Sequence, residues 1–90
     1  MSYLAKNYNR KKLSFKYGKG SYLYSSKNKK YLDFVQGIAV NSLGHAHPKL
    51  VKTIKNQSKK LWHVSNAFQI PEGEKLAKNL CKKTFADYVM

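Results

Sequence analysis

The sequence YLDFVQGIAVNSLGHAHP, residues 31–48, sets the organisation of this 90-residue chain. It opens with strand-forming residues, is interrupted at Gly37, continues through three apolar residues to Asn41, and is interrupted again at Gly44. Pro48 closes it, and a proline fits the first position of a helix because the amide it lacks would be unpaired there anyway. An apolar run set between glycines indicates a backbone held close to another element or to a ligand.

The residues before this stretch predict a β-hairpin. Strand-forming runs at 22–24 and 31–35 flank Lys27-Asn28, and asparagine tolerates the left-handed backbone of a tight turn. An earlier alternation, at residues 14–17, is interrupted by Gly18-Lys19-Gly20. This glycine pair lacks the further glycine and the following helix of a phosphate-binding loop, so we interpret it as a turn or bulge.

Two amphipathic helices are predicted after the hairpin. The first runs from about residue 48 to residue 62, with apolar residues at helical spacing and lysines mostly on the other side. The second begins at Pro71, and the acidic residues in its first turn suit the helix dipole. Residues 86–90 predict a turn that enters a strand. We therefore expect an α/β fold class made of a hairpin, a loop, two helices and the start of a strand.

These elements do not close a core, because each helix has an apolar face that needs a further layer. We expect a piece of a longer polypeptide, incomplete as a domain. Residues 1–14 are polar and basic without a sustained period, and we interpret them as an N-terminal arm.

The net charge of +14 has two interpretations. Excess positive charge favours polyanionic partners, whereas lysines spread along a chain are typical of a solvated surface. Arg10 is the only arginine, and arginine is the residue that reads phosphates and base edges in a bidentate manner. We favour the solvated surface and no nucleic-acid partner. A small Lys- and Tyr-rich nucleic-acid-binding module is the alternative, and a non-catalytic interaction module is a third hypothesis.

The lone Cys81 excludes an internal disulfide and fits a reducing compartment. The first residues lack the apolar segment of a signal peptide, and no apolar run approaches the length of a membrane span. We expect a cytoplasmic protein without a membrane partner.

Three histidines, His45, His47 and His63, raise the possibility of a zinc site. No acid or cysteine clusters with them, and coordination needs three or four convergent ligands, so we favour hydrogen-bonding roles in a loop and expect no metal. Asp33 orients a ligand or bonds to neighbouring backbone, and we favour the second role. Ser65 lacks an evident base, so no nucleophile is assigned.

Cys81 lies on the apolar face of the second helix, where packing is the expected role. Trp62, Phe68 and the tyrosines are interpreted as core and cross-strand contacts in preference to base-stacking platforms. We assign no catalytic and no cofactor-binding residue in this chain.

Three segments carry a resemblance: YLDFVQGIAVNSLGHAHPKLVKTIKNQ, LWHVSNAF and IPEGEKLAKNL. They resemble the N-terminal region of class III pyridoxal-phosphate-dependent aminotransferases, and are most similar to the acetylornithine aminotransferases. LWHVSN favours that group over the 4-aminobutyrate enzymes. The resemblance implies that residues 15–90 are the N-terminal segment of the small domain of a fold type I homodimer, truncated before the cofactor-binding large domain.

The resemblance also implies amino transfer between N-acetylornithine and 2-oxoglutarate, in arginine biosynthesis, with pyridoxal 5'-phosphate as the electron sink. The amino donor is open among acetylornithine, succinylornithine, succinyldiaminopimelate and ornithine. The Schiff-base lysine, the acid that pairs with the pyridine nitrogen and the Ser-Gly phosphate loop would all lie beyond Met90. The 90-residue chain alone is therefore expected to be inactive and not to bind the cofactor.

Residue by residue, the resemblance implies a small part of the substrate pocket. Ile38 matches a position that lines the substrate side of the cofactor. The connector that contains Ser65, Asn66, Phe68 and Gln69 matches a segment near the pocket mouth that contributes to substrate selection. Gln69 stands where relatives often have tyrosine, which bears on the identity of the amino donor.

Overall fold

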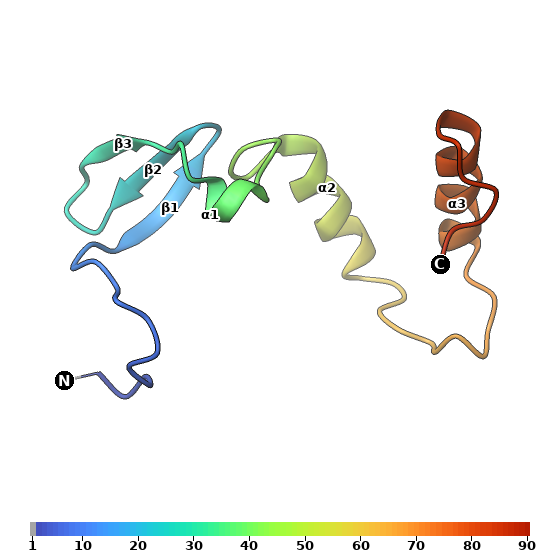
Figure 1. The fold of residues 1–90 in the computed structure, drawn as a ribbon, viewed down its shortest axis with the longest axis horizontal. Helices are drawn as coiled ribbons and strands as arrows, with labels where there is room; N and C mark the ends of the chain where they lie inside the picture. Colours follow the sequence, from blue (N-terminus) through green and yellow to red (C-terminus); the bar gives the residue numbers. More distant parts are fainter. Residues whose placement is uncertain (1) are drawn as a thin grey trace. The chain divides into compact units, whose positions relative to one another are not determined.

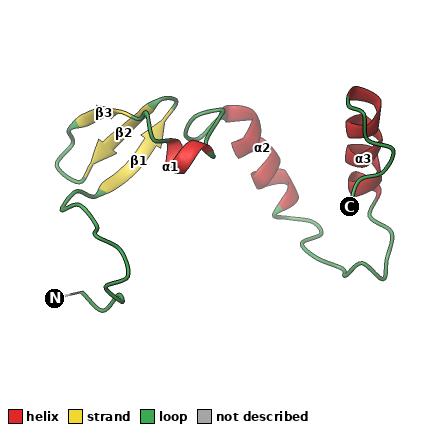
Figure 2. Cartoon of the chain, viewed as in Figure 1, coloured by secondary structure: helices red, strands yellow, loops and turns green. Residues whose placement is uncertain are grey.

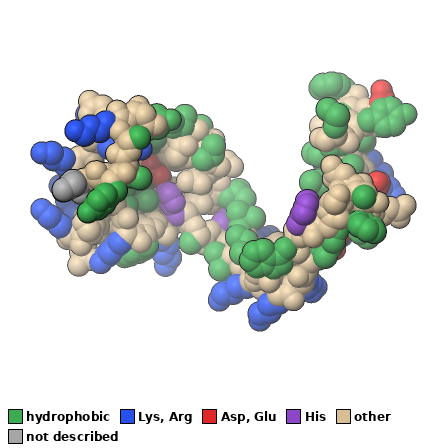
Figure 3. All heavy atoms as spheres, turned by 90° about the horizontal axis from the view of Figure 1, so that it is seen from below, with side chains coloured by type: hydrophobic (Ala, Val, Ile, Leu, Met, Phe, Trp, Pro, Cys, Tyr) green, Lys and Arg blue, Asp and Glu red, His purple; other side chains and the backbone are tan. Residues whose placement is uncertain are grey.

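The computed structural model describes residues 2–90, which divide into a first unit that ends at Asn56 and a second unit, Gln57–Met90. Along these described residues, three strands come first and three helices follow (Figures 1 and 2). No helix or strand includes residues 2–14. Among the described residues no hydrophobic side chain is buried, and Figure 3 shows hydrophobic side chains on the surface of both units.

The strands β1 (Phe15–Lys19), β2 (Tyr22–Ser25) and β3 (Lys30–Leu32) form one antiparallel sheet in the order β1-β2-β3. The predicted hairpin, β2 with β3, is confirmed. Asn28 in its turn has a φ of 61° and donates its backbone N–H to the Ser25 carbonyl at 2.9 Å. Such a left-handed residue is what a tight turn requires.

The sheet has one strand more than the hairpin. β1 continues through Gly18 and Lys19, and the chain turns at Gly20, whose φ is +57°. The expected turn is therefore found at Gly20. The interpretation was wrong for Gly18, which lies within β1 and pairs with Leu23, while the irregularity in register lies between Phe15 and Tyr17. The alternation at residues 14–17 predicted extended backbone, but its interruption hid the length of the strand.

Aromatic side chains pair across the strands of this sheet. Tyr17 of β1 stacks on Tyr24 of β2, with ring centroids 4.4 Å apart and an interplanar angle of 7°. The Lys30 ammonium lies 3.9 Å from the centroid of the Tyr22 ring. The expectation that tyrosines make cross-strand contacts is confirmed for these pairs, which are the kind that stabilise sheets.

Between the sheet and the second helix lies a short element that the sequence did not predict as a helix. α1 (Gln36–Ala39) is a single turn with backbone angles in the left-handed region. The apolar run was expected to form a turn, and it does. The left-handed backbone of this turn was not predicted from the sequence.

The helix α2 (Pro48–Gln57) begins at the predicted proline but ends five residues before Trp62. The prediction of its end was wrong, because after Gln57 the chain enters a turn in which the Lys60 N–H donates to the Gln57 carbonyl at 2.9 Å. The Gln57 side-chain amide donates to the Leu61 carbonyl, and the Trp62 indole N–H donates to the Ser58 carbonyl, each at 2.8 Å. These two side chains therefore satisfy carbonyl groups that lie beyond the end of the helix.

The helix α3 (Pro71–Lys83) confirms the second predicted helix, with the proline in its first turn, Glu72 and Glu74 close behind, and Lys82 and Lys83 at its end. No helix in the described part of the chain is long and apolar enough to cross a membrane.

The strand expected within residues 86–90 does not form, so that prediction was wrong for the described chain. A strand needs a neighbour to receive its backbone hydrogen bonds, and no described strand pairs with this segment.

Candidate functional site

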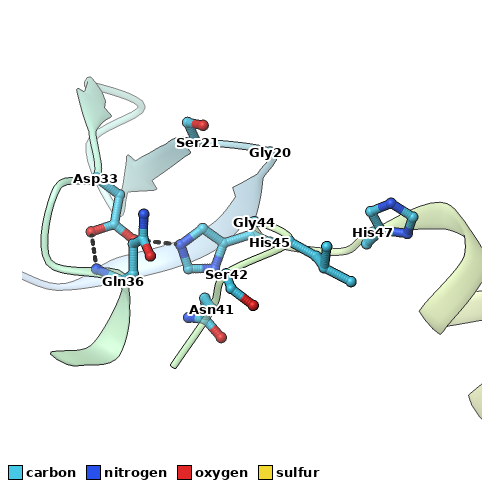
Figure 4. Close-up of a pocket in the computed structure, with 10 residues that line it drawn as sticks. Gly20, Ser21, Asp33, Gln36, Asn41, Ser42, Gly44, His45 and His47 are labelled. Carbon is cyan, nitrogen blue, oxygen red and sulfur yellow. Dashed lines mark hydrogen bonds and ion pairs between the residues drawn. The ribbon is translucent and has the colours of Figure 1, made fainter. Parts of the chain in front are cut away.

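Three segments of the first unit meet around a cavity of about 290 Å³. They are the turn between β1 and β2, the segment from Asp33 to Gln36, and the loop of residues 41–47. Figure 4 shows Asp33 and His45 facing each other in this cavity, with His47 at the start of α2. The sequence stretch at 31–48 supplies two of the three segments, so the glycine-interrupted run does lie against another element.

Asp33 is the anchor of the site, and its side chain is only 6% exposed. Its Oδ1 accepts hydrogen bonds from the backbone N–H of Val35 at 3.1 Å and of Gln36 at 2.9 Å. Its Oδ2 lies 2.6 Å from Nε2 of His45. The Gln36 amide first, and the His45 ring second, hold the pKa of Asp33 below its ordinary value. Hydrogen bonds to a carboxylate favour its charged form.

His45 also ties its loop to the sheet through its backbone. The Gly20 N–H donates to the His45 carbonyl at 3.0 Å, and the His45 N–H donates to the Gly20 carbonyl at 2.8 Å. The imidazole packs on Gly18, where a Cβ would lie 2.5 Å from Cγ of the ring. At Gly44, with a φ of +78°, a Cβ would lie 2.8 Å from the Gly20 carbonyl oxygen. Both positions therefore need glycine.

The left-handed turn α1 begins three residues after Asp33. Its φ values are 54° at Gln36, 63° at Gly37, 66° at Ile38 and 59° at Ala39. Only glycine adopts this region freely, and each L-residue there costs about 1–2 kcal/mol. Strain of this kind persists where the surroundings enforce it, and it gathers at ligand clamps and active sites. The turn is therefore the strongest sign of function in the first unit.

The side chains around the turn are apolar and exposed. Ile38 is 85% exposed, Phe34 86% and Val40 73%. These side chains gain little burial within the first unit, so the strained backbone is not compensated by local packing.

The expected pocket residues fall in both units. Ile38 lies in α1 of the first unit, and the connector residues lie between α2 and α3 in the second. Ser65 has a φ of 70°, and its Oγ accepts the Ala67 N–H at 3.3 Å. Phe68 is 69% exposed. The substrate-pocket roles of Ile38, Ser65, Asn66, Phe68 and Gln69 stay predictions.

The loop roles expected for the first two histidines are confirmed. His45 pairs with Asp33, and Nδ1 of His47 accepts the Lys49 N–H at 3.2 Å at the start of α2. Within residues 2–90 no group of three or more His, Cys, Asp or Glu side chains is placed to hold a metal ion. Asp33 bonds to neighbouring backbone, as expected, but its pairing with His45 was missed. The two residues stand 12 apart, and no periodic pattern links them.

Two aromatic residues expected in a core are exposed instead. Trp62 is 83% exposed and Phe68 69%. Cys81 on α3 is a free, half-buried cysteine. The packing role predicted for these side chains would need a layer that the described residues do not supply.

The sequence of this chain is similar to known aminotransferases. The aminotransferase class-III family matches residues 3–90. Acetylornithine aminotransferase 1 of Bradyrhizobium diazoefficiens is 55% identical over 80 residues, which are 89% of this chain and 20% of that protein.

Two solved structures are similar over most of the chain. The N-acetylornithine aminotransferase from Stenotrophomonas maltophilia matches with a TM-score of 0.75 and 35% identity, over 82% of this chain and 20% of that one. The ornithine delta-aminotransferase of Plasmodium falciparum matches with a TM-score of 0.89 and 30% identity, over 96% of this chain and 22% of that one. The chain thus spans about a fifth of the length of the curated relatives it matches.

Proposed function

Because this chain belongs to the class-III aminotransferase family, we propose that it is the N-terminal part of an acetylornithine-type aminotransferase. The complete enzyme moves an amino group between N-acetylornithine and 2-oxoglutarate, a step of arginine biosynthesis. The observation that carries the proposal is the 55% identity to an acetylornithine aminotransferase over 89% of the chain. The complete enzyme is a cytoplasmic homodimer in this proposal.

The family depends on pyridoxal phosphate, which supplies an electron sink when it is bound. The site around Asp33 does not fit that cofactor. The two cavities beside Asp33 have no lysine in their lining, and the cofactor needs a lysine for its covalent link to the enzyme. We place that lysine, the acid at the pyridine nitrogen and the phosphate loop in the remainder of the enzyme. The 90-residue chain is inactive by itself.

Within this proposal the described residues select the substrate. Ile38 offers an apolar contact from the tip of α1, where its side chain is 85% exposed. Ser65, Asn66, Phe68 and Gln69 form part of the pocket mouth. A glutamine in place of the tyrosine often found in relatives changes the polar groups available to the donor, so the donor must be measured.

The test uses the full-length protein loaded with pyridoxal phosphate. Glutamate formation from 2-oxoglutarate is followed with four donors: acetylornithine, succinylornithine, succinyldiaminopimelate and ornithine. We expect the highest kcat/KM for acetylornithine. A preference for ornithine would contradict the acetylornithine assignment, and absence of transfer from all four donors would contradict the proposed function.

The isolated 90-residue chain provides the matched control. Titration with pyridoxal phosphate should produce no saturable, site-specific change in the absorbance of the cofactor. A stoichiometric change that depends on one particular lysine would overturn the assignment of the cofactor site to the rest of the enzyme.

A further inference from the structure

The left-handed turn α1 is held by a clamp of three hydrogen bonds on one carboxylate. Asp33 accepts the N–H groups of Val35 and Gln36, which lead into the turn, through Oδ1. Its other oxygen pairs with His45 at 2.6 Å. One side chain therefore joins the entrance of the turn to the loop that follows it (Figure 4).

The clamp is itself anchored to the sheet. The backbone of His45 exchanges two hydrogen bonds with Gly20, at 3.0 and 2.8 Å, and Gly20 lies in the turn that joins β1 to β2. The Asp33 side chain is 6% exposed and the His45 side chain 21%. The carboxylate–imidazole pair is thus part-buried and joined to the sheet through the backbone of His45.

The turn held by the clamp carries an exposed apolar side chain. Ile38 has a φ of 66° and is 85% exposed. A β-branched residue in this backbone region is a genuine outlier. A part-buried pair that holds a strained turn with an exposed isoleucine in it indicates positioning of that isoleucine toward something it contacts.

We propose that Asp33 and His45 are positioning residues that hold the turn Gln36–Ala39 so that Ile38 contacts the apolar part of the amino donor. This inference rests on the proposed function, which identifies the amino donor as the ligand. The pair acts through the turn and does not itself touch the reacting atoms. It controls how well the donor is bound.

The first experiment measures steady-state kinetics of the full-length enzyme and its Ile38→Ala, Asp33→Asn and His45→Gln variants. A contact present both before and in the transition state affects KM and leaves kcat unchanged. We expect each variant to raise the KM for the amino donor by about tenfold, the effect of losing one good contact, with kcat and the KM for 2-oxoglutarate nearly unchanged. Asp87→Asn is the matched control, because it removes an exposed carboxylate from the second unit.

Coupling between the clamp and the isoleucine is the decisive readout. If the clamp acts through Ile38, adding Ile38→Ala to the Asp33→Asn enzyme should raise the donor KM little further, because the two changes remove the same contact. Independent, multiplying effects would overturn the inference. So would an equal rise in the KM for both substrates, or an unchanged donor KM in Ile38→Ala, a variant that leaves the clamp intact.

Hydrogen exchange separates the failure of this inference from failure of the proposed function. In the full-length protein, Asp33→Asn should speed exchange of the Val35 and Gln36 amides, and Asp87→Asn should not. Unchanged exchange in Asp33→Asn would overturn the clamp whatever the enzyme does. A second outcome is that the wild-type protein transfers no amino group while Asp33→Asn still speeds amide exchange. This outcome would overturn the proposed function and the contact with the donor, but it would support the clamp.

Discussion

At the residue scale, the site depends on one carboxylate and on glycines that let the backbone approach it. Asp33 accepts three hydrogen bonds, and the loop that carries its partner His45 lies close to Gly18 and Gly20. No larger residue fits at Gly18 or Gly44 without displacing a ring or a carbonyl group. The chemical identity of these few residues therefore decides whether the loop can reach the sheet.

The glycines provide a graded prediction for the full-length protein. Gly44→Ala should lower the free energy of unfolding by about 3 kcal/mol, because it adds a contact with the Gly20 carbonyl to an unfavourable φ. Gly20→Ala is the matched control, with a φ of +57° and nothing within 4 Å of the added Cβ. It should cost only about 1 kcal/mol. Chemical denaturation measures both, and equal effects would contradict the close approach.

The low pKa of Asp33 predicts a pH dependence with a definite sign. Its folded pKa lies below the ordinary value of 3.8, because the Gln36 amide and the His45 ring stabilise the carboxylate. The folded state therefore gains stability from this group above pH 3.8, and loses it as the pH falls through the folded pKa. Stability measured against pH should show this loss in the wild type and not in Asp33→Asn. Identical acid profiles for the two proteins would contradict it.

At the scale of elements, prolines and acidic side chains decide where the helices start. α2 and α3 both begin at a proline, and α3 has Glu72 and Glu74 in its first turn. The lengths of the elements follow from other causes. α2 stops at Gln57, whose carbonyl accepts the Lys60 N–H in the turn that follows. α1 keeps its left-handed form because Asp33 binds the amides at its entrance.

Helix α3 provides a prediction at this scale. Gly73 lies in its first turn, and a Cβ there would meet only Ile70 atoms at 3.8 and 3.9 Å, which is ordinary contact. Gly73→Ala should therefore raise the free energy of unfolding of the full-length protein by about 0.5–1 kcal/mol, since alanine has less backbone freedom to lose. A shift of the denaturation midpoint to higher denaturant concentration checks this. A lower midpoint would mean that the methyl group meets something outside the described residues.

At the scale of the whole molecule, the described residues expose most of their apolar side chains and carry a net charge of +14. Leu76 and Leu80 of α3 are 59% and 40% exposed, and Ile54 of α2 is 67% exposed. Folding depends on burying apolar surface, and like charges oppose a compact state. The isolated 90-residue chain is therefore expected to have a low free energy of unfolding.

We expect the isolated 90-residue chain to unfold without a cooperative transition. Circular dichroism should decrease gradually with temperature, and the heat capacity should show no sharp peak, because no buried apolar core melts as a unit. The full-length protein in the same buffer is the control and should melt sharply. A cooperative, monomeric transition of the 90-residue chain would contradict both this expectation and the apolar exposure of its helices.

Local signals were sufficient for the hairpin and for the start of both long helices. Asn28 and the prolines at 48 and 71 act through their own backbone preferences, which need no distant partner. The same reasoning failed at the end of α2, where the apolar spacing continues past the last helical residue, and at residues 86–90, where a strand needs a neighbouring strand. It also left Ile38 and the connector residues as family-derived expectations, because nothing in a linear pattern shows what faces a ligand.

The residues alone were enough to predict the hairpin and the starts of both long helices, because each of these depends on neighbours within a few positions. The apolar helix faces without a covering layer and the resemblance to an aminotransferase N-terminus also came from the sequence, read over the whole chain. Only the folded chain revealed the pair of Asp33 and His45, the contact of that loop with Gly20, and the left-handed turn at Gln36–Ala39. Hydrogen bonds between residues 12 or more apart have no sequence period. A left-handed backbone at isoleucine opposes its intrinsic preference, so it forms only where distant groups hold it.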